Sequence, residues 1–433
     1  MSTGDFPTES VGEGELEQRN RAYAILKNRD LRLYLTGKLI ATIGQQMLAT
    51  AVGWELFDRT HSVMKLALVG LTQVTPMIFF TLPAGHVADN HDRKRVITLM
   101  TLIVAVSSLG LTFISWKQMA VFWMYVCLFV SASARTFLTA ASASFLPSLV
   151  DRKDLSRAVN WNATTFQLSS IIGPTLAGGL IAIAGHRAFP IYGINVCASL
   201  IFAVMMTQIH THHVVAAREK MTFKTLLTGF NFVFANEIIL GIITLDMFAV
   251  LLGGSTALLP VYAASILKVG PTGLGFLQSA LPTGALICTF ILAHRPPIQK
   301  AGRSLLLAVA AFGVATIGFG LSRWFWVSFL MLFICGAVDN ISVVVRHTLV
   351  QLLTPDEKRG RVSAVNNLFI GTSNEMGEFE SGLVAYLLGP AIGNTVVAGT
   401  ILSVVAGGFG TIAVVAGIAL IFPHVRKYGR LDA

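Results

Sequence analysis

Charged side chains are scarce in this sequence, since Asp, Glu, Lys and Arg make up 12% of the 433 residues, against roughly a quarter in an ordinary soluble domain. Motifs of common enzymes are also missing: there is no Gly-Lys-Ser/Thr phosphate loop, no His-Glu-x-x-His and no Gly-x-Ser-x-Gly. The four cysteines lack metal-type spacing, so we interpret them as small packing residues. We therefore expect neither enzymatic activity nor a cofactor.

Long apolar runs are abundant instead, because hydrophobic residues make up 54% of the chain. A membrane span needs about 20 mostly apolar residues. The predicted spans cover residues 33–56, 66–88, 96–115, 119–146, 158–184, 188–209, 238–265, 271–293, 304–321, 324–352, 363–388 and 393–421. They lack the alternation of barrel strands, and helices satisfy their own backbone in lipid. We predict an all-α integral membrane protein with twelve transmembrane helices.

Lysine and arginine are unevenly distributed over the breaks between these spans. If the N-terminus is cytoplasmic, 23 of them fall on the cytoplasmic side and 6 on the other. The positive-inside rule therefore places both termini in the cytoplasm. The net charge of +10 follows from the same bias. Because the cations are spread over many short segments, we expect the lipid bilayer as partner and no nucleic acid.

A polar break near the middle of the chain divides the spans into six and six. We expect a disordered cytoplasmic tail over residues 1–24, a bundle over 25–209, a cytoplasmic linker over 210–236, a second bundle over 237–422 and a cytoplasmic tail over 423–433. The halves repeat weakly at an offset of about 205 residues, since Gly70 and Gln73 correspond to Gly275 and Gln278. This repeat predicts two six-helix bundles around a central cavity.

Several short stretches carry a family resemblance. The charged loop Gly85–Arg95 contains a glycine, two carboxylates and three cations. It resembles the signature between the second and third helices of the major facilitator superfamily, although His86 and His91 depart from the usual residues. Further stretches resemble its enterobactin-exporter-like branch: Asp339–Arg346, Thr354–Asn366, Asn374–Gly382 and Phe422–Lys427. The resemblance covers essentially residues 25–430.

This resemblance implies a secondary active transporter of the plasma (inner) membrane that works by alternating access. Its branch is similar to exporters of siderophores and other amphipathic or drug-like small molecules driven by the proton gradient. Uptake of a nutrient or metal chelate by the same fold is an alternative, and a non-transporting membrane receptor is another. We expect the protein to act as a monomer.

Ionisable side chains within the spans are candidates for function, because each costs about 2.5–3.5 kcal/mol to insert. Glu375 and Glu378 are three residues apart and Asn374 and Glu378 four apart, so they share a helix face, whereas Glu380 points elsewhere. Two carboxylates in one low-dielectric cavity suit proton coupling. The alternatives are structural pairing with Arg346 or Arg135, or a position at the periplasmic interface.

Other polar groups in the spans leave functional and structural interpretations open. Asp246 needs a cavity or an ion partner, and Arg135 and Arg346 each need a carboxylate, carbonyls or water. Glu55 beside Trp54 is expected to anchor a helix end at the interface. The neutral polar residues that are candidates for the cavity are Gln45, Gln46, Gln73, Asn160, Asn162, Gln167 and Gln278.

The resemblance also implies a cytoplasmic gate and a kinked helix with an antiporter-like sequence element. In the family, the loop aspartate faces the start of the eleventh helix and a nearby arginine. Here that aspartate is Asp89, and its partners would lie near Gly360 and Arg361. Gly85 and Arg93 belong to the same expected gate. The sequence Gly173–Gly179 resembles the Gly-Pro-x-x-Gly-Gly element of antiporters, with Ala177 in place of one glycine. We expect Gly173 and Pro174 to kink the fifth span, with either a structural or an export-specific role.

Overall fold

The computed structural model describes residues 25–210, 230–295, 298–392 and 395–429. Within these residues the regular secondary structure is entirely helical, which confirms the all-α prediction. The predicted tail over 1–24 and most of the predicted linker, 211–229, lie outside the described residues. Ten helical segments are long and apolar enough to cross a membrane. The two further long helices, Arg29–Thr60 and Asp356–Leu388, contain 32 and 33 residues but are more polar.

Among its described residues, the first half of the chain contains six long helices. They are α2 (Arg29–Thr60), α3 (Val63–Asn90), α4 (Arg93–Trp116), α5 (Val121–Phe145), α6 (Leu155–Ile183) and α7 (Phe189–Thr207). Short 3-10 helices cover Ile25–Lys27, Leu146–Ser148 and Arg152–Asp154. Each of these long helices overlaps one predicted span, with ends that differ by only a few residues.

The second half contains long helices and several short ones. The long helices are α9 (Glu237–Gly253), α11 (Gly270–Ala293), α12 (Ala301–Leu321), α13 (Phe325–Leu353), α14 (Asp356–Leu388) and α15 (Val396–Ile421). The short ones are η4 (Ser255–Leu258), α10 (Leu259–Val261), a π-helical turn (Tyr262–Ile266), η6 (Gly389–Ile392) and α16 (Pro423–Lys427). The predicted span over 238–265 agrees with the apolar segment Glu237–Ile266, but the segment is not one continuous helix, because α9 ends at Gly253.

Side-chain caps fix where several helices begin, as polar residues in the predicted loops suggest. Asn28 accepts hydrogen bonds from the backbone of Asp30 and Leu31 at the start of α2. Asp92 accepts one from the backbone of Lys94 at the start of α4. Each cap satisfies backbone donors that the first helical turn leaves free. The loop between α3 and α4 is therefore reduced to residues 91–92.

Helices of each half pack mainly on one another, and two crossings join the halves. In the first half, α4 packs on α5 and α7, α3 on α5, and α2 on α6 and α7. In the second half, α12 packs on α13 and α15, α11 on α13, and α9 and α14 on α15. The main crossings between the halves are α6 with α11 and α3 with α14.

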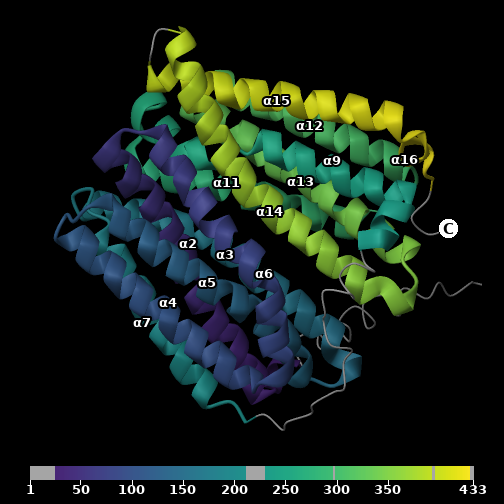
Figure 1. The fold of residues 1–433 in the computed structure, drawn as a ribbon, viewed down its shortest axis with the longest axis horizontal. Helices are drawn as coiled ribbons and strands as arrows, with labels where there is room; N and C mark the ends of the chain where they lie inside the picture. Colours follow the sequence, from purple (N-terminus) through teal and green to yellow (C-terminus); the bar gives the residue numbers. More distant parts are fainter. Residues whose placement is uncertain (1–24, 211–229, 296–297, 393–394, 430–433) are drawn as a thin grey trace, which may run out of the picture.

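The buried core shows that the halves are closed together at one end and separate at the other. One apolar cluster joins both halves through side chains such as Leu56, Tyr192, Leu274 and Phe319. At the opposite end, the core around Ala88 belongs to the first half, and the buried residues of a different core belong to the second, with Leu82 of α3 packed at its edge. Figure 1 shows the two groups of helices diverging toward the right-hand end of the view.

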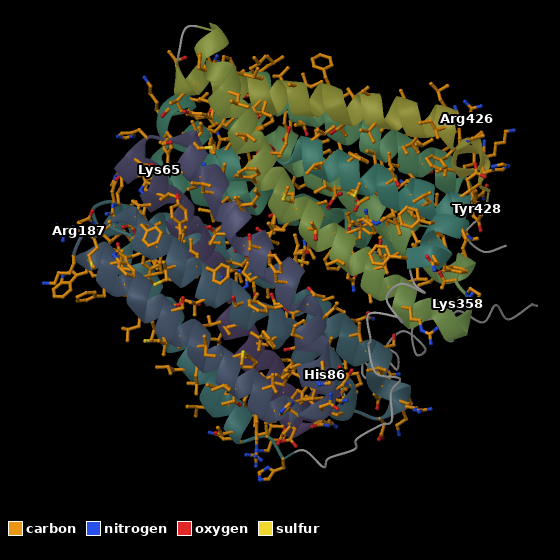
Figure 2. The ribbon with its side chains drawn as sticks, in the orientation of Figure 1. Lys65, His86, Arg187, Lys358, Arg426 and Tyr428 are labelled. Atoms are coloured by element: carbon orange, nitrogen blue, oxygen red, sulfur yellow. The ribbon has the colours of Figure 1, made fainter. Side chains whose placement is uncertain are left out.

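The ends of the molecule carry different sets of predicted loop residues. Figure 2 places Lys65 and Arg187 at the left-hand end, where the halves are closed together. It places His86 and Lys358 toward the right-hand end, on opposite sides of the divergence. The residues that the charge bias assigns to the cytoplasm thus lie at the end where the halves separate.

Candidate functional site

A cavity of about 600 Å³ lies between the halves and is bounded mainly by the first of them. Helices α2 to α7 supply most of the wall, and α14 closes it from the second half. Its charged and amide side chains are Lys38, Gln45, Gln46, Gln73, Arg135, Asn162, Glu375 and Glu378. A second cavity of about 370 Å³ between α3, α5 and α14 shares Gln73, Arg135 and Glu375. Of the sequence-predicted residues, Arg135 and the two glutamates are thus brought together.

Glu375 and Glu378 line the same cavity, as their spacing on α14 predicts. The Arg135 guanidinium interacts electrostatically with both carboxylates and donates a hydrogen bond to Gln73 Oε1 at 3.2 Å. Glu375 Oε2 is buried without a hydrogen-bond partner among the described residues. A buried carboxylate oxygen without a donor is costly, so this atom is suited to bind a proton or a ligand donor. Asn374, by contrast, is exposed and absent from the walls of these two cavities.

The interruption after α9 positions a partner for Glu378. Thr256 lies in η4 and donates a hydrogen bond from its hydroxyl to Glu378 Oε1 at 3.4 Å. The break lets α14 approach closely, because a Cβ on Gly254 would lie 2.8 Å from the backbone carbon of Gly377. Sequence reasoning missed this element. The small residues at 253–256, Gly-Gly-Ser-Thr, were the available signal.

The crossing of α3 and α14 holds the glutamates at the boundary between the halves. A Cβ on Gly70 would lie 2.6 Å from the carbonyl oxygen of Glu375 and 3.1 Å from the Cβ of Glu378. Only a glycine allows so close an approach, since real Cβ atoms do not come this near to backbone. A change in the shape or charge of this part of α14 therefore acts directly on the contact with the first half.

Asp246 and Arg346 lie away from these cavities and form an ion pair inside the second half. The pair joins α9 to α13, and its side chains are only 10% and 3% exposed. A small void of about 10 Å³ beside it is lined by Asp246, Asp339 and Ser342. The geometry agrees with the structural interpretation of both residues, in which each supplies the partner that the other needs in the membrane. Their part in coupling stays a prediction.

The residues of the expected cytoplasmic gate lie at the open end. Arg93 Nη1 donates to the carbonyl of Ser144 at 3.0 Å and so ties the start of α4 to the end of α5. Gly85 lines the smaller cavity. Within the described residues, the Asp89 carboxylate makes no hydrogen bond or ion pair. Arg361 lies near the start of α14, and in the described part of the chain Asp89 is not its partner.

Gly173 and Pro174 lie inside α6, where the chain packs closely on two neighbours. A Cβ on Gly173 would lie 2.5 Å from the Cβ of Gln46 in α2. On the other side of α6, the carbonyl of Pro174 lies against Gly275 of α11. These contacts show close packing at both predicted positions. Whether Gly173 and Pro174 also serve export specifically stays a prediction.

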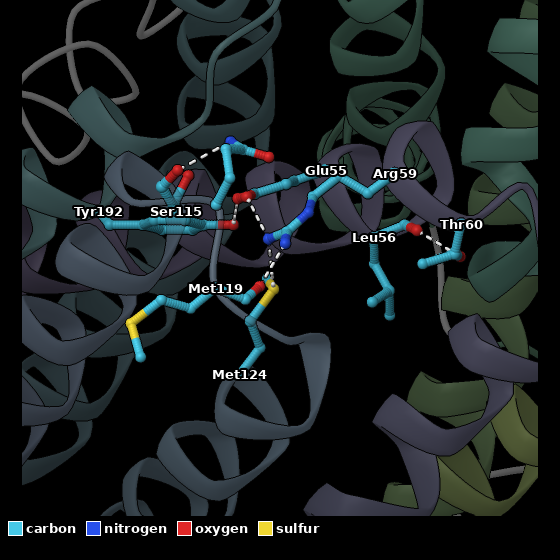
Figure 3. Close-up of polar contacts among 9 residues, drawn as sticks. Glu55, Leu56, Arg59, Thr60, Ser115, Met119, Met124 and Tyr192 are labelled. Atoms are coloured by element: carbon cyan, nitrogen blue, oxygen red, sulfur yellow. Dashed lines mark hydrogen bonds and ion pairs between the residues drawn. The ribbon is translucent and has the colours of Figure 1, made fainter.

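Glu55 is buried, which corrects the prediction of an interfacial anchor. Its side chain is 6% exposed and pairs with Arg59 at 3.2 Å. It also accepts a hydrogen bond from the Tyr192 hydroxyl at 2.8 Å, as Figure 3 shows. Arg59 donates in turn to the carbonyl of Met119. The position of Glu55 near a helix end predicts that it faces the interface, but α7 and the turn after α4 cover its carboxylate.

Lys38 is a cavity residue whose importance sequence reasoning missed. It lies in α2 and donates from Nζ to Asn162 Oδ1 at 2.6 Å. Both side chains line the larger cavity. The signal was present, because a lysine within an apolar span is a candidate for function by the same argument that was applied to the glutamates.

Comparison with protein families places this architecture in a known group. The family model described as transmembrane secretion effector matches residues 20–419. The chain belongs to this family of the major facilitator superfamily. Membership places it among multi-pass membrane transporters rather than enzymes. The expectation drawn from the loop and the α13–α14 stretches is thereby confirmed.

Individual relatives agree with this family over nearly the whole chain. The enterobactin exporters of Escherichia coli O1:K1 and of Shigella boydii serotype 18 are each 24% identical over 403 residues, covering 92% of both chains. An inward-facing bacterial homologue of the human lysosomal transporter Spinster has a TM-score of 0.69 at 13% identity, covering 92% of this chain and 98% of that one. The nucleoside transporter NupG has a TM-score of 0.67 at 16% identity, covering 93% and 100%.

Proposed function

We propose that this protein is a proton-coupled exporter of an amphipathic small molecule, such as a siderophore or a drug-like compound. In this proposal, twelve helices cross the plasma (inner) membrane as two six-helix bundles, with both termini in the cytoplasm. The helices α2 and α14, which are the more polar long helices, then line the transport path together with α3 to α7. Part of their polarity lies in the side chains they present to the cavity, such as Lys38 of α2 and Glu375 and Glu378 of α14.

Alternating access would operate across the cavity between the halves. The described state, with a common core at one end and separate cores at the other, corresponds to access from the cytoplasm. Substrate would enter there, and the molecule would then close at that end and open at the other. The two crossings between the halves, α6 with α11 and α3 with α14, are where such a rearrangement would turn.

The observation that carries the proposal is the placement of Glu375 and Glu378. Both carboxylates line the cavity, lie next to a close contact between α3 and α14, and share the influence of Arg135. Proton binding would change the charge of this crossing by one unit without moving any other group. A proton exchanged here can therefore favour one packing of α14 over another, which is the requirement for coupling.

Efflux from proteoliposomes tests the proposal. Enterobactin is the first probe, because the curated relatives are named as its exporters, and ethidium is a second amphipathic probe. Wild-type protein should move at least one probe faster when an imposed pH gradient drives protons in the direction opposite to the movement of the probe. Glu375→Gln or Glu378→Gln should abolish the stimulation by the gradient, while exchange of labelled for unlabelled probe continues.

Glu380→Gln is the matched control, because Glu380 lies two residues further along α14 and does not line the two cavities. It should retain the response to the pH gradient. Unchanged pH dependence in both Glu375→Gln and Glu378→Gln would remove the coupling role. Probe movement only in the inward direction, in vesicles of known orientation, would overturn export.

A further inference from the structure

The ammonium group of Lys38 enters the cavity without a matching carboxylate. It donates to the neutral amide oxygen of Asn162 at 2.6 Å and lies 5.5 Å from the centre of the Tyr34 ring. Among the described residues no carboxylate is within ion-pair distance of it. The other cation of the cavity, Arg135, differs in this respect, because its charge acts on Glu375 and Glu378.

Lys38 and Asn162 together present unused hydrogen-bond donors. A lysine ammonium has three N–H groups, and one of them is taken by Asn162. The amide nitrogen of Asn162 donates to no group in the described part of the chain. A charged donor next to a neutral one matches the two oxygens of a carboxylate or the oxygens of a sulfonate.

The wall beside these donors is apolar and partly aromatic. Phe166 projects from α6 and Phe202 from α7, and Leu138 of α5 and Leu146 of the 3-10 turn that follows it complete this side. The volume of about 600 Å³ lies in the range of pockets that hold drug-sized ligands, roughly 300–1,000 Å³. An aromatic or other apolar body fits this wall while its acidic group meets Lys38.

The donors lie apart from the glutamates along the cavity. Lys38 precedes Gln45 by seven residues on α2, which is about 10 Å of helix toward the open end. Gln45 also lines a smaller pocket of about 140 Å³ that contains Glu378. An acidic group at Lys38 therefore does not have to displace a proton from Glu375 or Glu378.

We propose that Lys38 and Asn162 form a subsite for the acidic group of an amphipathic organic anion, whose apolar body lies along Phe166 and Phe202. This inference rests on the proposed transport function, since it names the class of molecule that the cavity accepts. It assigns recognition of the anionic group to the first half of the chain and proton exchange to α14.

Binding of a matched pair of probes tests the subsite. Radiolabelled 1-naphthoate and its neutral analogue 1-naphthamide are titrated against the full-length protein in lipid nanodiscs. Wild-type protein should bind the acid about tenfold or more tightly than the amide, since the amide oxygen is a neutral acceptor and the attraction between opposite charges is lost. Lys38→Met should reduce that preference to near one, and Lys38→Arg should keep most of it.

Two further variants distinguish loss of the subsite from loss of the folded protein. Asn162→Asp offers Lys38 a carboxylate and should also remove the preference for the acid. Lys117→Met changes an exposed lysine outside the cavity and should leave the preference unchanged. The proposal is overturned if wild-type protein binds the two probes equally or binds neither, or if Lys38→Met and Asn162→Asp both retain the wild-type preference.

The outcome is separable from that of the proposed function. Failure of the subsite would appear as unaltered probe preference in Lys38→Met while pH-driven efflux of enterobactin or ethidium proceeds. Failure of the transport proposal would appear as a Lys38-dependent preference for naphthoate with no gradient-driven movement of any probe in proteoliposomes.

Discussion

Gly178 of α6 packs so closely on Gly275 of α11 that a side chain on either would overlap the backbone of the opposite helix. A Cβ at Gly178 would meet the Pro271 carbonyl and lie 3.1 Å from Gly275 Cα, and a Cβ at Gly275 would meet the Pro174 carbonyl. The other crossing repeats this pattern, because Gly70 of α3 lies against the backbone of α14. The weak sequence repeat is therefore expressed at the two main crossings that join the halves.

Two neighbouring glycines in α6 provide a matched test of this packing. We expect Gly178→Ala to lower stability by about 1–3 kcal/mol, because the added methyl group has no space and the helices must separate. Gly179→Ala should be neutral or slightly stabilising, because nothing lies within 4 Å of its Cβ position and alanine favours helix. Thermal unfolding in detergent measures both. Equal effects of the two substitutions would contradict the packing argument.

The buried pair of Asp246 and Arg346 should respond to substitution as a unit. Asp246→Asn leaves the guanidinium without its partner, and Arg346→Gln does the same to the carboxylate. Each single change should destabilise by about 3–5 kcal/mol, since an uncompensated charge is left buried. The free energy of unfolding that the double variant loses should be smaller than the sum of the two single losses. Thermal unfolding of the four proteins gives the coupling energy, and strict additivity would show that the pair does not interact.

Glu55 should stabilise the closed end of the molecule without affecting the cavity. Glu55→Gln weakens the pairing with Arg59 and the bond from the Tyr192 hydroxyl. We expect a loss of about 1.5–3 kcal/mol, the range for hydrogen bonds to charged groups. Tyr192→Phe removes one of these contacts and should cost less. Preserved binding of the cavity probes alongside a lowered unfolding temperature would support this, whereas lost probe binding at full stability would contradict it.

Sequence patterns predicted the helices well because membrane burial imposes long apolar runs with polar breaks. Their ends were uncertain where polar residues continue the helix, as at the start of α14, which begins at Asp356 rather than near residue 363. The break at Gly254 was missed, because the composition of 238–265 stays apolar across it. Its cause is tertiary, since α14 passes close to the interrupted backbone at Gly377.

Residue types identified the candidate site, but the ion-pair and hydrogen-bond partners of its side chains depend on contacts between segments that are distant in the sequence. The spacing of Glu375 and Glu378 was sufficient to place them on one face. No local pattern could show that Asp246 pairs with Arg346, one hundred residues away, or that Tyr192 covers Glu55. Lys38 was visible as a charge within a span, but its lack of a carboxylate partner became clear only from the packed helices.

Asp89 gives a prediction about the conformational equilibrium. In the described state it makes no hydrogen bond or ion pair within the described residues, and the halves are separate at its end. If its carboxylate meets the positive start of α14 when this end closes, Asp89→Asn removes about 0.3–1 kcal/mol or more from the closed form. The population should then shift about two- to fivefold toward the open form, and transport should slow.

Spin labels on either side of the opening measure this shift. With the four native cysteines replaced, His91→Cys and Lys358→Cys place labels on α3–α4 and α14, so their distance distribution reports closure. Asp151→Asn is the control, because Asp151 is an exposed carboxylate in the loop before α6. Asp89→Asn should enrich the longer distances and reduce gradient-driven efflux together, while the control changes neither. A normal distance distribution combined with reduced efflux would show that Asp89 acts on transport by a route other than closure of α3 against α14.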